Sequence, residues 1–228
     1  MFRPTENVSR NPAIPTATAR PPFNIDVAVD HLSKKDRTLG RLIRQVGPCG
    51  LEIAPRQSPY EALAESIVYQ QFTGKAAATI YARLCKSFGS RRCPSPEKIA
   101  DAALDQLRAA GLSRNKAAAL RDLAYKVLDG DIPTRRAAEK LSDEELVERL
   151  TAVKGIGRWT VEMFLIFTLG RPDVLPLDDY GVRKGFARAY GRDVLPRPKE
   201  LATQGERWRP YRTAASWYLW RATELEVS

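Results

Sequence analysis

The sequence is poor in the side chains that most often carry metal and redox chemistry. It has one histidine, His31, and three cysteines, Cys49, Cys85 and Cys93. A single histidine excludes chemistry that requires a second one, and it excludes a histidine-rich zinc site. Three thiols are too few for an iron–sulfur cluster held by four cysteines, and their odd number fits no disulfide framework. We therefore expect reduced thiols, and we expect any proton transfer to use a carboxylate, a lysine or a tyrosine.

Long apolar stretches are also absent. No run approaches the ~20 residues needed to span a bilayer, and the N-terminus lacks the apolar core of a secretory signal. We therefore expect a soluble, intracellular protein. What the sequence has in excess is positive charge, because 37 Lys and Arg against 27 Asp and Glu give a formal charge of +10. Such a charge favours an anionic partner, but it does not choose between a nucleic acid and a membrane surface.

Apolar residues recur at helical spacing along most of the chain. Residues 1–22 contain five prolines and almost no apolar periodicity, so they predict a flexible basic tail. From about Asp26 onward the pattern is helical, which predicts an all-α fold. Capping boxes at Ser58–Glu61 and Ser142–Glu145 mark two helix starts. The expected helices span residues 59–72, 74–88, 103–110, 114–129, 143–152, 158–169, 179–190 and 209–223, with glycines 89, 111 and 130 as stops.

A glycine pair joins two of these expected helices. Within Leu150–Thr160, Gly155 and Gly157 bracket Ile156 between a charged amphipathic helix and an apolar one. Glycine at both positions permits positive φ angles and lets a phosphate approach the main chain closely. The N–H groups that open the second helix would then face this phosphate, and the contact would not depend on base sequence. The alternative is a plain glycine-rich turn between two helices.

Four motifs follow one another along the chain: Gln70–Phe72, Gly155–Thr160, Leu177–Tyr180 and Trp208–Arg212. Together they resemble the helix-hairpin-helix (HhH-GPD) DNA glycosylase superfamily, and within it the AlkA-like 3-methyladenine DNA glycosylase II family. The resemblance runs from about Pro59 to Glu224. It implies a monofunctional DNA glycosylase that flips out alkylated, cationic bases such as 3-methyladenine and 7-methylguanine. Such an enzyme hydrolyses the N-glycosidic bond and leaves an abasic site in base excision repair.

The resemblance places the catalytic carboxylate on Asp179, next to Asp178. An ionised Asp near the sugar can stabilise the oxocarbenium-like charge that develops as the glycosidic bond breaks, and it can orient or deprotonate water. The alternative role for an Asp at a helix start is an N-cap, and the two roles can fall on different members of the pair. Trp159 occupies the place where bifunctional relatives carry the lysine that forms a Schiff base. Without that amine the covalent route has no nucleophile, so we expect no lyase activity.

The base pocket that the resemblance implies contains Trp159, Trp220 and Met163. An electron-rich indole attracts a cationic base by about 0.5 to 2 kcal/mol. The family often has an aromatic residue where this chain has Met163, so the aromatic lining of the pocket differs here. We assign Trp208 and Trp217 to core packing.

Gln71 and Phe72 match the wedge of the family, which fills the gap that a flipped base leaves in the stack. Many members have leucine where this chain has Phe72. A phenylalanine ring can fill this space and also stack on bases. The alternative is that Phe72 is an ordinary core residue at a helix end.

The resemblance also implies that the hairpin contacts the DNA backbone, through Lys154, Gly155, Ile156, Gly157 and Arg158. It further implies a monovalent cation, Na⁺ or K⁺, bound by the backbone carbonyls of Thr151, Val153 and Gly155 with a DNA phosphate as a further ligand. The chemistry itself requires no cofactor, and the iron–sulfur cluster of some relatives is not expected.

Positive charge is concentrated after the expected catalytic residue. From Tyr180 to Arg221 there are ten Arg and Lys against three Asp and Glu. We interpret this run as a surface that follows DNA phosphates, and the alternative is a solvated helix face. The expected partner is therefore double-stranded DNA that contains alkylated bases, and no membrane. We expect a monomer, located in the cytoplasm and associated with the nucleoid if the source is bacterial.

The organisation expected from the resemblance is two helical lobes that flank a DNA-binding cleft. Residues 23–58 and 171–228 would form one lobe, and residues 59–170 would form the other, ending in the helix-hairpin-helix at about 143–169. Too few residues precede Ser58 for the N-terminal α/β domain of larger bacterial members, so we expect the compact form. Two other functions compete. A noncatalytic hairpin protein that binds damaged DNA would not need Asp179, and a bifunctional glycosylase for oxidised bases is disfavoured by Trp159.

Overall fold

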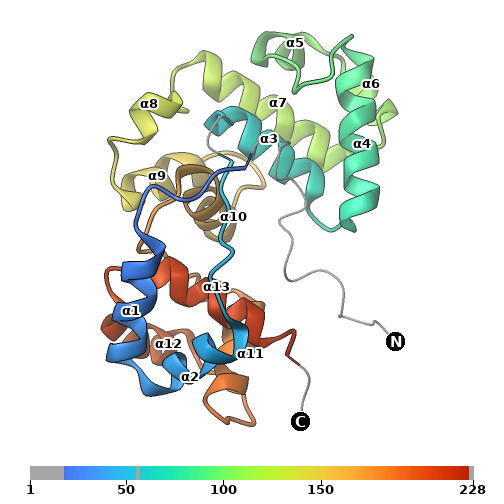
Figure 1. The fold of residues 1–228 in the computed structure, drawn as a ribbon. Coiled ribbons are helices and arrows are strands. Elements are labelled where there is room, and N and C mark those ends of the chain that lie inside the picture. The colour runs from blue at the N-terminus through green and yellow to red at the C-terminus, as the bar shows by residue number, and fades with distance from the viewer. Residues whose placement is uncertain (1–17, 55–56, 226–228) are drawn as a thin grey trace. The chain divides into compact units, whose positions relative to one another are not determined.

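A computed structural model describes residues 18–54 and 57–225, which form an all-α fold (Figure 1). Within this part of the chain the only β pairing is one antiparallel bridge, between Ala19 and Ile53. The all-α fold class is therefore confirmed. None of the described helices is long and apolar enough to cross a membrane. The chain divides into two compact units.

The first unit combines the N-terminal helices with the C-terminal part of the chain. Its described residues are 18–54 and 165–225. Its helix α13 (Arg212–Ala222) packs against the other long helices of the unit, so α13 is the core helix here (Figure 1). The other elements are α1 (Ile25–Lys35), α2 (Arg37–Val46), the π-helix η1 (Leu165–Leu169), α11 (Tyr180–Ala189), α12 (Pro198–Gly205) and the 3-10 helix η2 (Glu206–Trp208).

One buried carboxylate joins several elements of this unit. Asp36 is the N-cap of α2, and its Oδ1 accepts hydrogen bonds from two backbone N–H groups of that helix (3.0 and 3.1 Å). Its Oδ2 accepts from the Tyr190 hydroxyl, from Gln204 Nε2 (2.7 Å) and from Trp208 Nε1 (3.0 Å). Burial alone would raise the pKa of Asp36, but these hydrogen bonds lower it below its usual value. The fully buried Trp208 confirms the packing role expected for it.

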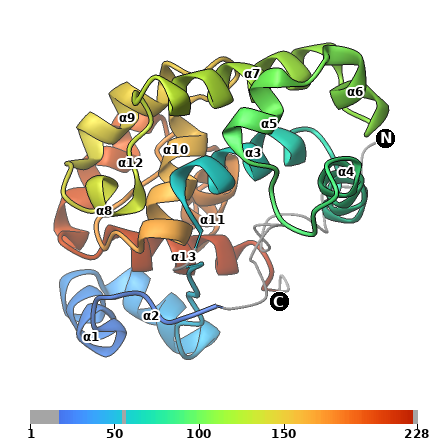
Figure 2. The ribbon, with the colours of Figure 1, turned by 90° about the horizontal axis from the view of Figure 1, so that it is seen from above.

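The second unit contains the central part of the chain, and its described residues are 57–164. Helix α7 (Arg114–Leu128) packs against α3 (Pro59–Tyr69), α5 (Pro96–Asp101) and α6 (Leu104–Ala109), as Figure 2 shows. Helix α10 (Arg158–Phe164) packs against α9 (Asp143–Thr151) and α3. The remaining helices are α4 (Gly74–Ser87) and α8 (Arg135–Ala138). Both expected capping boxes are present, at the starts of α3 and α9.

The helix boundaries differ from expectation in a few places. The expected helix 158–169 is α-helical only to Phe164 and then becomes the π-helix η1, a local change that is typical of functional sites. The last expected helix begins at Arg212 rather than at 209, because Pro210 disfavours helical geometry for the residue before it. The short helices α5, α8 and α12 are not among the expected ones, since one or two turns carry too little periodicity to detect.

The end of the expected flexible tail is ordered. Residues 1–17 lie outside the described part of the chain. Ala19, however, exchanges two backbone hydrogen bonds with Ile53 (3.0 and 2.9 Å), and Pro21 is buried. Pro22 lies so close to Gly170 that a Cβ at Gly170 would stand 2.5 Å from the Pro22 ring. The expectation of a flexible tail to residue 22 is therefore wrong for residues 18–22, because backbone pairing and packing hold them. The sequence places the lobe boundaries after residues 58 and 170, and the structure divides the chain into its two units after residues 55 and 164.

Candidate functional site

Asp179 is the residue that directly precedes α11, and it caps that helix. Its Oδ1 accepts a hydrogen bond from the backbone N–H of Val182 (2.7 Å), which is the N-cap interaction. The same oxygen accepts from Trp220 Nε1 (2.9 Å). The N-cap role therefore falls on the residue expected to be catalytic, and the neighbouring Asp178 is exposed. The Asp179 side chain is thus held from two directions.

The indole that holds Asp179 is itself buried. Trp220 is 5% exposed, and its ring stacks on Phe167 of η1, with centroids 5.7 Å apart and an angle of 25° between the planes. In the first unit Trp220 is thus fixed by a stacking partner and by a hydrogen bond to a carboxylate. Phe167 was missed by the sequence analysis, because an aromatic residue late in an apolar helix gives no signal of its own.

The loop that leads to Asp179 is attached to the start of α13. Thr213 Oγ1 donates to the Arg171 carbonyl (2.6 Å) and accepts from the Val174 N–H (3.0 Å). The Arg212 guanidinium pairs with the Asp173 carboxylate (2.7 Å), in a partly buried position. These bonds explain the Trp208–Arg212 motif, since its last residue anchors the loop. α13 therefore binds this loop at its first turn and Asp179 near its last.

The hairpin, residues 152–157, joins α9 to α10 in the second unit. Gly155 has a φ of 78°, which favours glycine, whereas Gly157 does not have a positive φ. Of the two glycines, only Gly155 uses the positive φ that glycine permits. A Cβ at Gly157 would meet nothing within 4 Å, so this glycine leaves open space beside the main chain. That space is compatible with a ligand that approaches the backbone.

Ile156 lies inside the hairpin, and its expected contact with the DNA backbone stays a prediction. Its side chain is 5% exposed, and its N–H donates to the Val153 carbonyl (3.1 Å). The structure therefore gives Ile156 a packing role inside the hairpin, and its amide is already used.

The two basic side chains of the hairpin have acidic partners. Lys154 Nζ lies 3.6 Å from an Asp122 oxygen, and the Lys154 backbone N–H donates to the same carboxylate (2.8 Å). Arg158 Nε donates to Glu162 Oε1 (3.1 Å). Both basic side chains remain mostly exposed, at 76% and 61%. A phosphate at the hairpin would thus meet accessible cations that are already partly neutralised.

Trp159 lies in the first turn of α10, directly after the hairpin. It is 49% exposed, which is unusual for an indole and leaves much of its surface accessible. Met163, one turn later on the same helix, is partly buried. These two residues, which the resemblance places in the base pocket, belong to the second unit, whereas Asp179 and Trp220 belong to the first.

The wedge loop, residues Gln70–Thr73, connects α3 to α4. Gln71 is exposed and has a φ of 61°, a left-handed conformation that is uncommon outside glycine. Phe72 is half-buried, and the Lys116 ammonium lies 3.7 Å from the centre of its ring. Gln71 is therefore the tip of the loop, and Phe72 forms its base.

Much of the positive charge after Asp179 has protein acceptors. Arg183 and Arg188 donate to backbone carbonyls, at 2.9 and 3.3 Å. Arg209 and Arg212 both pair with Asp173. The exposed basic residues of this run include Lys184, Lys199 and Arg207. Much of this charge therefore stabilises the first unit, and only part of it is offered to a ligand.

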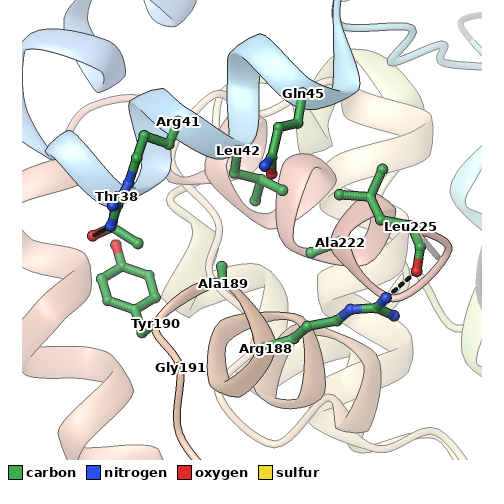
Figure 3. Close-up of a pocket in the computed structure, with 10 residues that line it drawn as sticks. All are labelled: Thr38, Arg41, Leu42, Gln45, Arg188, Ala189, Tyr190, Gly191, Ala222 and Leu225. Atoms are coloured by element: carbon green, nitrogen blue, oxygen red, sulfur yellow. Dashed lines mark hydrogen bonds between the residues drawn. The ribbon is translucent and has the colours of Figure 1, made fainter. Parts of the chain in front are cut away.

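A separate hollow in the first unit contains none of the expected site residues. Figure 3 shows it between α2 and the end of α11, with Thr38, Arg41 and Tyr190 among the side chains that line it. The Arg188 guanidinium at its edge donates to the Thr223 and Leu225 carbonyls, so this arginine is used to hold the end of α13.

All three cysteines of the chain are free thiols.

A family model described as HhH-GPD superfamily base excision DNA repair protein matches residues 64–210. The chain belongs to this superfamily. The matched range of the HhH-GPD model includes the wedge loop, the hairpin and Asp179, but it ends before Trp220. The resemblance inferred from the four motifs is thus confirmed.

Relatives of known sequence support the same membership. The chain is 41% identical over 200 residues to DNA-3-methyladenine glycosylase 1 of Schizosaccharomyces pombe, and the aligned region covers 86% of each protein. It is 30% identical over 201 residues to the putative DNA-3-methyladenine glycosylase YfjP of Bacillus subtilis, which covers 86% of this chain and 68% of that protein.

Two solved structures resemble this one closely. The S. pombe 3-methyladenine DNA glycosylase Mag1, in complex with abasic DNA, superposes with a TM-score of 0.77 at 41% identity, covering 87% of this chain and 97% of the other. A DNA-3-methyladenine glycosidase from Bacillus halodurans superposes with a TM-score of 0.78 at 32% identity, and the match covers 91% of this chain and 92% of the other.

Proposed function

We propose that this chain is a monofunctional DNA glycosylase that removes alkylated, cationic bases such as 3-methyladenine and 7-methylguanine in base excision repair. The observation that carries the proposal is a carboxylate, Asp179, held by an indole N–H in a chain 41% identical to a DNA-3-methyladenine glycosylase. The partner of this proposed enzyme is double-stranded DNA with alkylated bases, and the enzyme acts in the compartment that contains the genomic DNA.

In this proposal Asp179 is the catalytic carboxylate. As the bond between C1′ and the base nitrogen breaks, its electron pair goes to the base, and a cationic base leaves as a neutral molecule. The positive charge that develops on the sugar is stabilised by the Asp179 carboxylate. Water then adds to C1′, and its proton passes to the carboxylate or to solvent. The product is an abasic site with an intact strand.

The absence of an amine at Trp159 supports a hydrolytic route. A lyase reaction would need a lysine to attack C1′ and form a Schiff base, and an indole cannot do this. We assign to Trp159 instead the recognition of the lesion, since its exposed ring can stack on a cationic base. Met163 would contact the same base, and Trp220 would contribute mainly by orienting Asp179.

The wedge and the hairpin complete the proposal. Gln71, as the exposed tip of the wedge loop, would enter the gap left by the flipped base, with Phe72 supporting it. The N–H groups of Gly155 and Gly157, with Lys154 and Arg158, would bind the DNA backbone.

The carbonyls of Thr151, Val153 and Gly155 are the groups that would hold a Na⁺ or K⁺ ion. The Gly155 carbonyl already accepts from Gln70 Nε2 (2.9 Å), and the Val153 carbonyl accepts from the Ile156 N–H. Each carbonyl oxygen has a second lone pair, so these bonds leave acceptor capacity for a cation. The bound ion would offset phosphate charge at the hairpin.

The decisive experiment compares Asp179→Asn with Asp178→Asn on methylated duplex DNA. Asparagine is also a good N-cap, so Asp179→Asn preserves the start of α11 while removing the charge. Released bases, abasic sites and strand breaks are measured separately. We expect Asp179→Asn to lose base release and to retain DNA binding, whereas the exposed Asp178→Asn retains both.

Three results would contradict this proposal. Unchanged base release by Asp179→Asn would reject the assigned mechanism. Strand breaks that accompany base release by the unmodified protein would indicate a bifunctional enzyme. DNA binding without any base release would favour a noncatalytic protein that binds damaged DNA.

A further inference from the structure

We propose that Lys116 is a positioning residue that presents the tip of the wedge loop to DNA. The inference rests on the proposed function, because it concerns how the glycosylase inserts its wedge. Lys116 is the third residue of α7 and is 8% exposed. Such burial is rare for a lysine unless its charge has a specific partner.

Within the described residues, the Lys116 ammonium contacts the end of α3 and the wedge loop. Its Nζ donates to the Val68 carbonyl (2.8 Å) and to the Gln70 carbonyl. It also lies 3.7 Å from the centre of the Phe72 ring, within the range of a cation–π interaction. Among the described residues, no carboxylate pairs with Lys116. Backbone carbonyls at the negative end of a helix and a ring face therefore replace a counter-ion.

This arrangement brackets Gln71. The ammonium contacts residues 68 and 70 on one side of Gln71 and residue 72 on the other, but Gln71 itself is exposed. Its positive φ of 61° costs free energy for a residue other than glycine, so the surrounding contacts must maintain it. Lys116 supplies three such contacts. Without them, the chain around Gln71 would relax toward more common φ angles and the tip would lose its fixed direction.

Helix α7 also connects to the hairpin. Asp122, almost two turns after Lys116, accepts a hydrogen bond from the Lys154 backbone N–H (2.8 Å). The Gln70 side chain donates to the Gly155 carbonyl (2.9 Å), so the wedge loop and the hairpin are also joined directly. A Cβ at Gly155 would stand 3.6 Å from the Ala119 Cβ on α7. Lys116 thus acts in a helix that holds both the proposed wedge and the proposed phosphate site.

Burial of the ammonium is consistent with this role. Desolvation lowers the pKa of Lys116 to about 8, so at neutral pH the group is mostly charged. A lysine that served only to cover apolar surface would extend its ammonium into water.

The test measures wedge insertion independently of base release. A DNA duplex carries an abasic-site analogue with 2-aminopurine on the opposite strand, whose fluorescence reports how its stacking changes when a side chain enters the gap. Binding affinity is measured on the same duplex, and thermal unfolding monitors the fold. Lys116→Met is compared with Lys126→Met, which removes the same charge from the same helix where the lysine instead pairs with Asp131. Gln71→Ala, which removes the tip, defines the signal without a wedge.

We expect Lys116→Met to shift the balance from inserted toward withdrawn wedge by about tenfold, as loss of charged hydrogen bonds to two carbonyls predicts. Its fluorescence should approach that of Gln71→Ala, while Lys126→Met keeps the signal of the unmodified protein. If Lys116→Met does not fold, Lys116→Gln decides, since it keeps a donor for the carbonyls and loses only the charge over Phe72. An intermediate signal for Lys116→Gln supports the proposal.

Two results would overturn the inference. The first is a folded Lys116 variant whose fluorescence signal equals that of the unmodified protein. The second is an equal loss of signal in Lys116→Met and Lys126→Met, which would indicate a general effect of charge. The assay needs no catalysis, so the absence of base release would count against the proposed function alone and would leave this result interpretable.

Discussion

Replacement of Gly185 by alanine tests whether the contact between α11 and α13 positions the carboxylate of Asp179, the proposed catalytic residue. An alanine Cβ at this position would stand 1.8 Å from the Leu219 carbonyl oxygen and 2.6 Å from its carbon. An ordinary carbon–oxygen contact is about 3.3 Å, so the two helices must separate by roughly 1.5 Å. The obstacle is backbone, which cannot rotate away as a side chain would.

The expected size of the effect follows from two opposing contributions. Overpacking of a core costs about 1–3 kcal/mol, and a clash with backbone lies at the upper end of that range. Alanine in place of glycine inside a helix contributes about 1 kcal/mol of stability. We therefore expect a net loss of about 2 kcal/mol, which lowers the Tm of a chain of this size by about 4–8 °C.

The same separation affects the site. Trp220 follows Leu219 directly, and its Nε1 lies 2.9 Å from Asp179 Oδ1, at the start of α11. Displacement of α13 by about 1 Å would lengthen or break this bond, and misplacement on that scale can cost about 100-fold in rate. Single-turnover base release, measured well below the Tm of the variant, should therefore fall by about ten- to 100-fold.

Gly50→Ala is the control, because a Cβ there makes only an ordinary contact of 3.4 Å with Trp217. It should retain both the Tm and the rate of base release. If Gly185→Ala also retained both, the reasoning about helix packing would be refuted. A lower Tm with an unchanged rate would show that the packing stabilises the fold without positioning Asp179.

Three further substitutions give separate predictions. Burial raises the pKa of Glu65 to about 7, so the folded state loses stability as pH rises from about 4.5 to 7. Glu65→Gln should therefore raise the Tm at pH 8 by the equivalent of about 3 kcal/mol, but hardly at pH 4. Equal Tm values for this variant and the unmodified protein at pH 8 would contradict the prediction. Asp36→Ala should lower the free energy of unfolding, measured by urea titration, by about 3 kcal/mol, because it leaves the buried Trp208 N–H without its acceptor. A loss below about 1 kcal/mol would argue against a stabilising role for the hydrogen bonds to Asp36. Trp220→Phe should keep the Tm within a few degrees and slow base release at least about tenfold, because it retains a ring but removes the donor to Asp179; unchanged kinetics would show that this hydrogen bond does not orient the carboxylate.

Part of the candidate site was predictable from the sequence because its signals are local. The hairpin was found from two glycines that bracket an apolar residue, and the helix starts were found from residues three positions apart. Asp179 was assigned from its motif, and its helix-capping role follows from its place directly before α11. Spacing alone does not tell exposure, however, and only the structure shows that Gln71 of the wedge loop is exposed whereas Phe72 is half-buried.

Other features depend on partners that no local pattern indicates. Asp36 binds Trp208, 172 positions away, and Lys116 binds the Val68 carbonyl, 48 positions away. The buried lysine reads in the sequence as an ordinary charged residue of an amphipathic helix. Its burial becomes meaningful only beside the carbonyls and the ring that surround it.

The sequence by itself determined the all-α class, the main helices, the hairpin and the residue types available for chemistry, because caps, glycines and apolar periodicity act within a few residues of one another. Tertiary structure alone decided which helices approach closely enough to require Gly185, which indole donates to Asp179, and what holds the wedge loop. These depend on contacts between distant segments, and such contacts are set by how whole helices pack rather than by the spacing of residues along the chain.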